Sequence, residues 1–231
     1  MKLVINEKLI NRNKRIGQIA TFSSLAILAG GLFLAFQSDI TRMLLSYVAL
    51  IVGFITSQVG IYYTNRFGRN PRFDELFTKN LQKLSNQYTF YVYSSPIPML
   101  LVGPSGFWLP IPISAGGNIS YMKNRWRQQG GNFLMKLFAQ EGIGRPSIEE
   151  AANISDLTKY IRKVSEINDN LPPMQTVLVL MNENAEIGDV ENAPTQIIHI
   201  KKLRRYLRKV DRDYPNPLSD EALEAITALF S

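Results

Sequence analysis

Residues 100–119, LLVGPSGFWLPIPISAGGNI, decide how the rest of the chain is interpreted. Two runs of strand-forming residues, 99–102 and 107–113, flank the tetrapeptide GPSG at 103–106, whose residues suit the backbone angles of a tight turn. We therefore predict two strands joined by a turn. No Asp, Glu, Lys, Arg or His lies between positions 93 and 122, so the predicted strand pair has no side chain that could bind a cation or accept a proton.

Two prolines, Pro110 and Pro112, lie within the second of these predicted strands. A proline has no backbone N–H and cannot donate a hydrogen bond to a neighbouring strand. We therefore expect strand 107–113 to lie at the edge of its sheet or to be bulged where the prolines occur.

The segments on both sides of the strand pair predict an α/β protein. Residues 73–87 have an apolar stripe at helical spacing, with Asp74 and Glu75 in the first turn and lysines later, which is the charge order that a helix dipole favours. The apolar run 176–181 is typical of a strand buried on both faces. The other predicted elements are strands at 88–93, 118–123 and 195–200, and helices at 133–140, 147–167, 201–212 and 219–230.

Two long segments without charges precede the α/β part. Residues 16–37 and 43–65 each match the roughly 20 residues that cross a hydrocarbon core as a helix, and only residues 38–42 separate them. The sequence therefore predicts a transmembrane helical hairpin over residues 16–66. A secretory signal peptide is the alternative for the first segment, but its apolar stretch is longer than the usual ~7 to 15 residues and a second span follows almost at once.

The charges around the hairpin predict its orientation. Basic residues precede the first span and follow the second, whereas the connecting loop has one, Arg42. By the positive-inside rule, both termini face the cytoplasm, and residues 1–15 form a basic cytoplasmic N-terminus. The flanking basic residues are Lys2, Lys8, Arg12, Lys14 and Arg15 before the hairpin, and Arg66, Arg69 and Arg72 after it.

Small residues four positions apart, Ala26 with Gly30 and Gly53 with Ser57, would let membrane helices approach closely. They could thereby support contact within the hairpin, or binding of a protein partner or a second copy. Small residues are also common in membrane helices in general, and the sequence does not separate these readings.

The composition limits the chemistry that the chain can perform. It has no cysteine and one histidine, which excludes disulfides, cysteine nucleophiles and cysteine-ligated metals. Residues 1–42 hold six basic and two acidic residues, and therefore contribute more than half of the net charge of +7. Much of the basic character thus reflects the predicted membrane topology rather than a nucleic-acid partner.

The predicted order of helix, strand, turned strand pair, further strand, helix and strand resembles the αβββαβ core of the restriction-endonuclease-like fold, with extra C-terminal helices. Over residues 72–128, the GPSG turn, the apolar strand after it, Gly117, Ile119 and Trp126 resemble the nuclease-related domain of bacterial proteins, which is often found beside membrane helices. The resemblance implies that residues 72–231 are a cytoplasmic nuclease-related domain, and that the chain is an integral protein of the bacterial inner or cell membrane.

The resemblance also implies where a nuclease of this family would hold its metal. The family has an aspartate before the Gly-Pro turn, and an acidic residue and a lysine on the strand after it. Two carboxylates bind a cation such as Mg²⁺, and the lysine helps to position the attacking water. These positions fall on Pro98, Ile111 and Ile113, none of which can perform these roles.

We therefore expect no metal cofactor and no catalysis by the usual mechanism. Asp74 and Glu75, on the leading predicted helix, are the only possible remnants of the family's acidic residues. The alternative is a Mg²⁺-dependent nuclease with relocated acidic ligands, which would draw on Asp74, Glu75 and Glu141.

The predicted helix 201–212 is the strongest candidate for a binding surface. Its basic residues follow helical spacing opposite an apolar stripe, so nucleic acid, anionic lipid head groups and plain solvent are all reasonable contacts for this face. The residues of this basic face are Lys201, Arg204, Arg205, Arg208 and Arg212.

Three weaker candidates remain. Arg125, Trp126 and Arg127 could stack on nucleic-acid bases, although a tryptophan after a strand also serves packing. His199 lacks the second histidine or the cysteines of a zinc site and is expected to be structural. The acidic segment 182–192, with Glu183, Glu186, Asp189 and Glu191, lacks a calcium-loop pattern and is expected to be a solvated loop.

These observations favour a membrane-anchored, catalytically inactive nuclease-related domain that serves as a binding or scaffolding module. The alternatives are the nuclease with relocated acids, and a tether that holds nucleic acid or anionic lipid through the basic helix.

Overall fold

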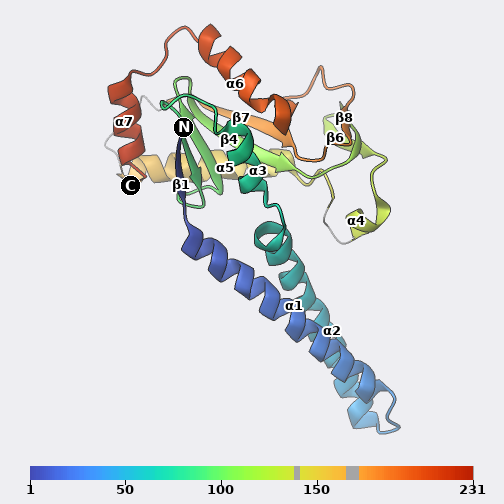
Figure 1. Ribbon diagram of the computed structural model, residues 1–231. Helices are drawn as coiled ribbons and strands as arrows, with labels where there is room; N and C mark the ends of the chain where they lie inside the picture. Colours follow the sequence, from blue (N-terminus) through green and yellow to red (C-terminus); the bar gives the residue numbers. More distant parts are fainter. Residues whose placement is uncertain (138–140, 165–171, 231) are drawn as a thin grey trace. The chain divides into compact units, whose positions relative to one another are not determined.

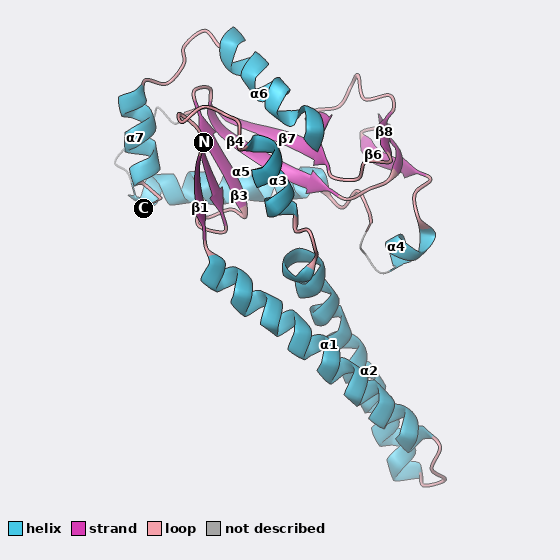
Figure 2. Cartoon of the chain, viewed as in Figure 1, coloured by secondary structure: helices cyan, strands magenta, loops and turns pink. Residues whose placement is uncertain are grey.

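The computed structural model describes residues 1–137, 141–164 and 172–230, which divide into two compact units. One unit, here called the helical hairpin, is Glu7–Arg72. The other, here called the α/β domain, combines Met1–Asn6 with Phe73–Ser231. Figure 1 shows the order of the elements along the chain, and Figure 2 distinguishes helices from strands.

The helical hairpin consists of α1 (Glu7–Ala35) and α2 (Ile40–Tyr63), and α2 continues as one π-helical segment, η1 (Thr64–Gly68). By length and composition, both helices could cross a membrane. Helix α1 begins nine residues before the predicted span, and therefore includes most of the basic N-terminal residues. Asp39 caps α2, because its side chain accepts a hydrogen bond from the Thr41 N–H at 3.0 Å.

The two helices pack along small residues spaced seven apart. A Cβ on Gly53 would lie 2.7 Å from Cγ of Leu28, and one on Gly60 would lie 2.9 Å from the Thr21 backbone nitrogen, so neither site has room for a side chain. Seven residues span two helical turns, which keeps such positions on one face. The buried small residues are Gly17, Ser24 and Gly31 on α1, and Ser46, Gly53 and Gly60 on α2.

This small-residue seam corrects one prediction and confirms part of another. Ala26 and Gly30 are exposed, and no described atom lies within 4 Å of a Cβ placed on Gly30. The interpretation of this pair as a contact within the hairpin is therefore wrong, whereas Gly53 does lie at the interface. The seven-residue spacing, rather than the four-residue pair, marks the face on which α1 meets α2.

The α/β domain is built on a six-stranded sheet in which all strands but one run in the same direction. Only β3 is antiparallel to its neighbours, so the carboxyl ends of the other strands all lie at the same end of the sheet. In spatial order the strands are β1 (Lys2–Ile5), β2 (Thr89–Val92), β3 (Met99–Gly103), β4 (Gly106–Ile113), β7 (Met174–Leu180) and β9 (Gln196–His199).

Strand β1 was not predicted. It pairs in parallel with β2, with Lys2 opposite Thr89 and Ile5 opposite Val92, and the terminal amino group donates to the Leu84 carbonyl at 3.1 Å. The first residues of the predicted basic N-terminus are therefore part of the α/β domain. Consequently the helical hairpin is an insertion between the first two strands of one sheet.

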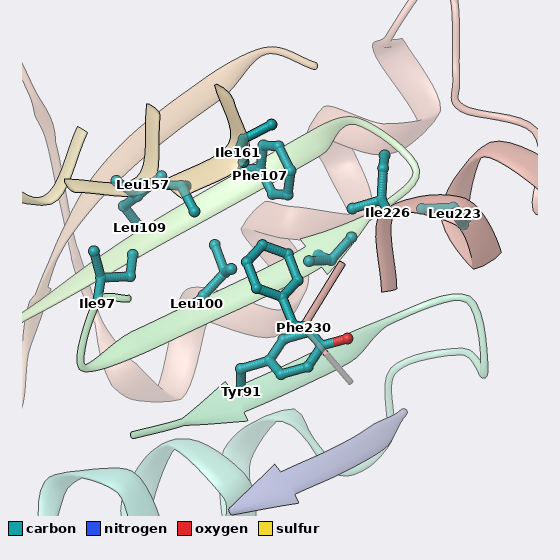
Figure 3. Close-up of a cluster of buried hydrophobic side chains, with 11 residues drawn as sticks. Tyr91, Ile97, Leu100, Phe107, Leu109, Leu157, Ile161, Leu223, Ile226 and Phe230 are labelled. Atoms are coloured by element: carbon teal, nitrogen blue, oxygen red, sulfur yellow. The ribbon is translucent and has the colours of Figure 1, made fainter. Parts of the chain in front are cut away.

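Helices cover both faces of this sheet. One face packs against α5 (Pro146–Val164) and α7 (Asp220–Ala228), and Figure 3 shows the buried side chains that they share. The other face packs against α3 (Phe73–Leu81) and α6 (Ile200–Asp213), where the rings of Phe77 and Phe90 lie 6.0 Å apart and those of Trp108 and Tyr206 lie 5.9 Å apart. The first face is lined by Tyr91, Leu100, Phe107, Leu109, Leu157, Ile161, Leu223, Ile226 and Phe230.

The expectation that strand 107–113 lies at a sheet edge is wrong, because β4 lies between β3 and β7. Its pairing with β3 ends at Trp108, whereas its pairing with β7 continues to Ile113. The Phe107 N–H and the Ile113 carbonyl both bond on the β7 side, so residues of odd number face β7. Pro110 and Pro112 therefore face the side from which β3 has diverged, and no ladder bond is lost there.

A second, three-stranded sheet has the order β6 (Arg125–Gln129), β5 (Gly117–Met122) and β8 (Ala185–Ile187). Lys123 and Asn124 join β5 to β6 with φ of 53° and 58°, as the first and second residues of a two-residue hairpin turn of type I′ require. Strands β6 and β8 were not predicted. Of the predicted helices, 133–140 appears as α4 (Phe133–Leu137), while residues 138–140 and 165–167 lie outside the described residues.

The seam of the helical hairpin can be tested by cross-linking, because the chain has no cysteine of its own. A Cβ on Gly31 would lie 3.0 Å from Cβ of Ala49, so we expect the pair Gly31→Cys with Ala49→Cys to form a disulfide under mild oxidation. The matched control is Gly30→Cys with Ala49→Cys, which should remain reduced. Equal cross-linking of both pairs, measured by gel shift with a thiol reagent, would contradict this packing.

Candidate functional site

The strand positions that correspond to a nuclease metal site are filled by apolar side chains. Ile111 and Ile113 are 0% and 3% exposed, and they belong to a cluster that also contains Leu178, Leu180, Ile197 and residues of the second sheet. Pro98 is half-buried, and its carbonyl accepts a hydrogen bond from the Tyr93 N–H at 2.9 Å. This region is therefore part of the core and offers no oxygen ligand from these side chains.

The three acids of the relocated-site hypothesis lie in different settings. Asp74, on α3, is 3% exposed, and the neighbouring Glu75 is exposed. Glu141 is 7% exposed and follows α4. Within residues 1–137, 141–164 and 172–230, no three His, Asp or Glu side chains are grouped so that they could hold one metal ion. The structure therefore does not bring Asp74, Glu75 and Glu141 together as one set of ligands.

Glu141 is nevertheless an unusual residue, because a buried carboxylate is costly without partners. Its Oε2 accepts a hydrogen bond from the Asn132 N–H at 2.9 Å, while Oε1 has no partner among the described residues. A Cβ on Gly131 would lie 2.6 Å from Oε1, and one on Gly116 would be closer still. The carboxylate thus bonds to the start of α4 and lies close to the chain after β4, where the two glycines leave space for it.

Helix α6, which is labelled in Figure 1, carries the most concentrated charge of the α/β domain. Leu203 and Leu207 are buried beneath it, and its basic side chains lie on the remaining surface. A surface hollow of about 920 Å³ runs along this side and is lined by Arg204, Arg205, Arg208 and Arg212, with Lys202 and Lys209. We call the set Lys201, Lys202, Arg204, Arg205, Arg208, Lys209 and Arg212 the basic face.

Three members of the basic face have partners within the protein. Lys201 forms an ion pair with Glu183 at 2.8 Å, and Arg212 forms one with Asp213 at 3.3 Å, in both of which the side chains are largely exposed. Arg208 donates a hydrogen bond to the Lys83 carbonyl. Arg204 and Arg205 line the hollow midway along the helix. Four of the five predicted cations therefore line one hollow, which also includes Lys202 and Lys209, two residues that the prediction omitted. Lys201 instead lines a separate hollow beside Glu183.

Asp211 anchors this helix to the β3–β4 turn. The Ser105 hydroxyl donates to the Asp211 carboxylate, and Nε1 of Trp108 donates to the same Ser105 oxygen at 3.0 Å. Ser105 is fully buried. Burial raises the pKa of Asp211 from 3.8 to about 6, and a hydrogen bond from Ser105 acts in the opposite direction. Sequence reasoning missed this network, although the acidic Asp211 within the predicted basic helix 201–212 was a visible signal.

The candidates at 125–127 are separate from the basic face, because they lie on β6 of the second sheet. Arg125 and Arg127 are exposed, whereas Trp126 packs edge to face on Tyr121 at 5.1 Å and against the cluster that contains Ile111. Trp126 is thus engaged in packing, which was the alternative to base stacking.

His199 immediately precedes α6. Partial burial lowers its pKa, and the positive charges of Lys202 and Lys201 add to this effect. The acidic segment 182–192 is not a plain loop, because β8 lies within it and Glu183 pairs with Lys201. Asp189 accepts a hydrogen bond from the Glu191 N–H at 3.3 Å.

Comparison of the chain with protein-family models, with curated proteins and with solved structures finds no match. The resemblance to the nuclease-related domain therefore depends on the order and spacing of the elements alone.

The elevated pKa of Asp211 predicts a pH-dependent stability. Because its folded pKa of about 6 lies above its ordinary 3.8, the folded state binds this proton more tightly, and the resulting stability is lost as the pH rises from ~4 to ~6. Asp211→Asn keeps an acceptor for Ser105 without the charge. Above pH ~6 it should therefore be more stable than the wild type by about 1 kcal/mol, after allowance for solvent screening of a half-exposed group.

The difference between the two proteins should shrink toward pH 4, as measured by thermal unfolding across this range. Asp213→Asn, at an exposed neighbouring position, is the matched control and should show no such trend. A constant difference between wild type and Asp211→Asn at all pH values would contradict the assignment.

Proposed function

We propose that the chain is a membrane-anchored binding module whose α/β domain has a restriction-endonuclease-like layout without a working nuclease site. The burial of Ile111 and Ile113 in an apolar cluster is the observation that carries this proposal. A hard divalent cation requires oxygen ligands in an accessible cavity, and hydrocarbon side chains supply none. The order α3, β2, β3, β4, α5 and β7 supports the layout, with β5 and β6 as an insertion.

Membrane anchoring is supported by the surface of the helical hairpin. Large apolar side chains along both helices are exposed, among them Phe22 at 73%, Phe33 at 67% and Phe54 at 62%. Such a surface is unfavourable in water and is normal for a helix pair surrounded by lipid. It also differs from the core helix of a soluble protein, whose apolar side chains would be covered.

The parallel pairing of β1 with β2 supports a single-sided topology. Asn6 and Phe73 belong to the same folded domain, so a hairpin between them must return to the side from which it starts. The basic residues at both ends then favour the cytoplasm as that side. Both termini belong to the α/β domain and therefore lie in the same compartment as that domain.

The basic face of α6 is the surface that we assign to binding. Seven cations on 12 consecutive residues, held on a helix that is fixed to the sheet, form a preorganised site for a polyanion. Nucleic acid and anionic lipid are the two classes that such a surface recognises in the cytoplasm beside a membrane.

Absence of nuclease activity is the first prediction of this function. The full chain, purified in detergent, should not cleave single-stranded or double-stranded DNA or RNA above background with Mg²⁺ or Mn²⁺ present. Glu75→Gln and Glu141→Gln should leave that background unchanged, since neither residue contributes to a site. Metal-dependent cleavage that either substitution abolishes would overturn the proposal and restore the relocated-ligand hypothesis.

Binding through the basic face is the second prediction. Arg204→Glu with Arg205→Glu should weaken binding of a polyanion at least about tenfold at low salt, because two cations become two anions at the centre of the hollow. Arg125→Glu with Arg127→Glu makes the same change in net charge on the second sheet and serves as the control.

The two ligand classes are separated by measuring each pair of variants against fluorescent single-stranded DNA and against vesicles that contain phosphatidylserine. An equal loss for both pairs of substitutions would show a general effect of net charge, and would remove the basic face as the binding surface.

A further inference from the structure

A separate cavity of about 340 Å³ lies where three distant segments of the α/β domain meet. It is bounded by the chain between α3 and β2, by the β3–β4 turn at Pro104, and by the last turns of α6. This place is the opposite end of β4 from Ile113, roughly 25 Å away for a strand of eight residues. The cavity is therefore distinct from the positions of the nuclease ligands.

The cavity wall carries two cations. Lys83 and Arg208 both line it, and the Arg208 guanidinium is positioned by its hydrogen bond to the Lys83 carbonyl. Arg208 also lines the larger hollow along the basic face. The cavity therefore continues that hollow toward the end of the sheet at which β4 begins. Asp211 is the acid on the wall, and its carboxylate is engaged by Ser105.

Tyr88 also lines the cavity. The residue is 3% exposed, and its hydroxyl oxygen has no hydrogen-bond partner among the described residues. The ring lies against Gly103, where a Cβ would be 2.5 Å from Cε1, so the glycine admits the ring at this position. A buried hydroxyl without a partner is destabilising, and a phenylalanine would fill the same space without that cost.

We propose that this cavity binds a phosphate group, with Lys83 and Arg208 as the charged contacts and the Tyr88 hydroxyl as a further donor. An ammonium, a guanidinium and a hydroxyl donor around one cavity are suited to an oxyanion that presents several acceptor oxygens. A terminal phosphate of a polyanion on the basic face would reach the cavity through Arg208, which faces both. This last step rests on the proposed function, whereas binding of phosphate by itself does not.

The test uses the full chain in a maltoside detergent and a buffer without phosphate, titrated with inorganic phosphate and followed by calorimetry. Tyr88→Phe should weaken phosphate binding at least about fivefold while leaving the thermal unfolding midpoint unchanged or slightly raised. Arg208→Gln should weaken it at least about tenfold. Arg205→Gln is the matched control, because Arg205 lines the hollow but not the cavity, and it should bind phosphate as the wild type does.

No binding of phosphate by the wild type, or equal binding by the wild type, Tyr88→Phe and Arg208→Gln, would overturn the proposal. A second arm compares a short oligonucleotide that has a 5′-phosphate with the same strand ending in a hydroxyl. If the wild type prefers the phosphorylated strand and Tyr88→Phe has no such preference, the phosphate that the cavity binds belongs to nucleic acid. Phosphate binding without any binding of oligonucleotide or anionic vesicles would leave the cavity assigned, and would contradict only the binding function of the basic face.

Discussion

The pairing of β1 with β2 is the constraint on which the arrangement of the chain depends. Residues at the very start of the chain must reach the edge of a sheet whose other strands follow the helical hairpin. The hairpin must therefore begin and end within reach of the same sheet. A flexible loop of this length would resist such closure through its entropy. A stiff pair of helices resists it less, because its packing brings the end of α2 close to the first half of α1: a Cβ on Gly17 would lie 3.0 Å from atoms of Tyr63 and Thr64.

A separate constraint acts on β4. One face of this strand is covered by α5 and α7 near the start of the strand. Phe107 and Leu109 pack against those helices. Ile111 and Ile113, on the same face, pack instead with Ala115 and with Ile119 and Ala185 of the second sheet. The covering layer thus changes halfway along one strand. A strand that presented metal ligands would need this second half to be open to a substrate. Here the second sheet fills it, and apolar side chains at 111 and 113 are what a closed interface requires.

Periodic and apolar elements were predictable from sequence, while short and polar ones were not. The strand pair around 103–106, the apolar strand β7 and the basic helix α6 each have a strong local pattern, and each is present. Strand β1 is only four residues long, and all side chains of β6 except Trp126 are long and polar, so the stability of both strands comes from pairing partners that no local pattern reveals. The edge position expected from Pro110 and Pro112 was wrong. A proline requires only that the side of the strand that it faces be unpaired, and the other side of β4 remains paired with β7.

The same distinction applies to the candidate binding surfaces. The basic face could be read from helical spacing, since charge and period are both local properties of the chain. The adjoining cavity could not, because Tyr88, Pro104 and Arg208 meet only after the sheet and α6 are packed. The Ser105–Asp211 contact joins the last turns of α6 to the distant β3–β4 turn, in addition to the packing of Leu203 and Leu207 beneath the helix. Cations on a fixed helix repeat about every 6 Å along the row at i, i+4, which suits a repeating polyanion, whereas the smaller cavity beside Tyr88 suits a single anionic group.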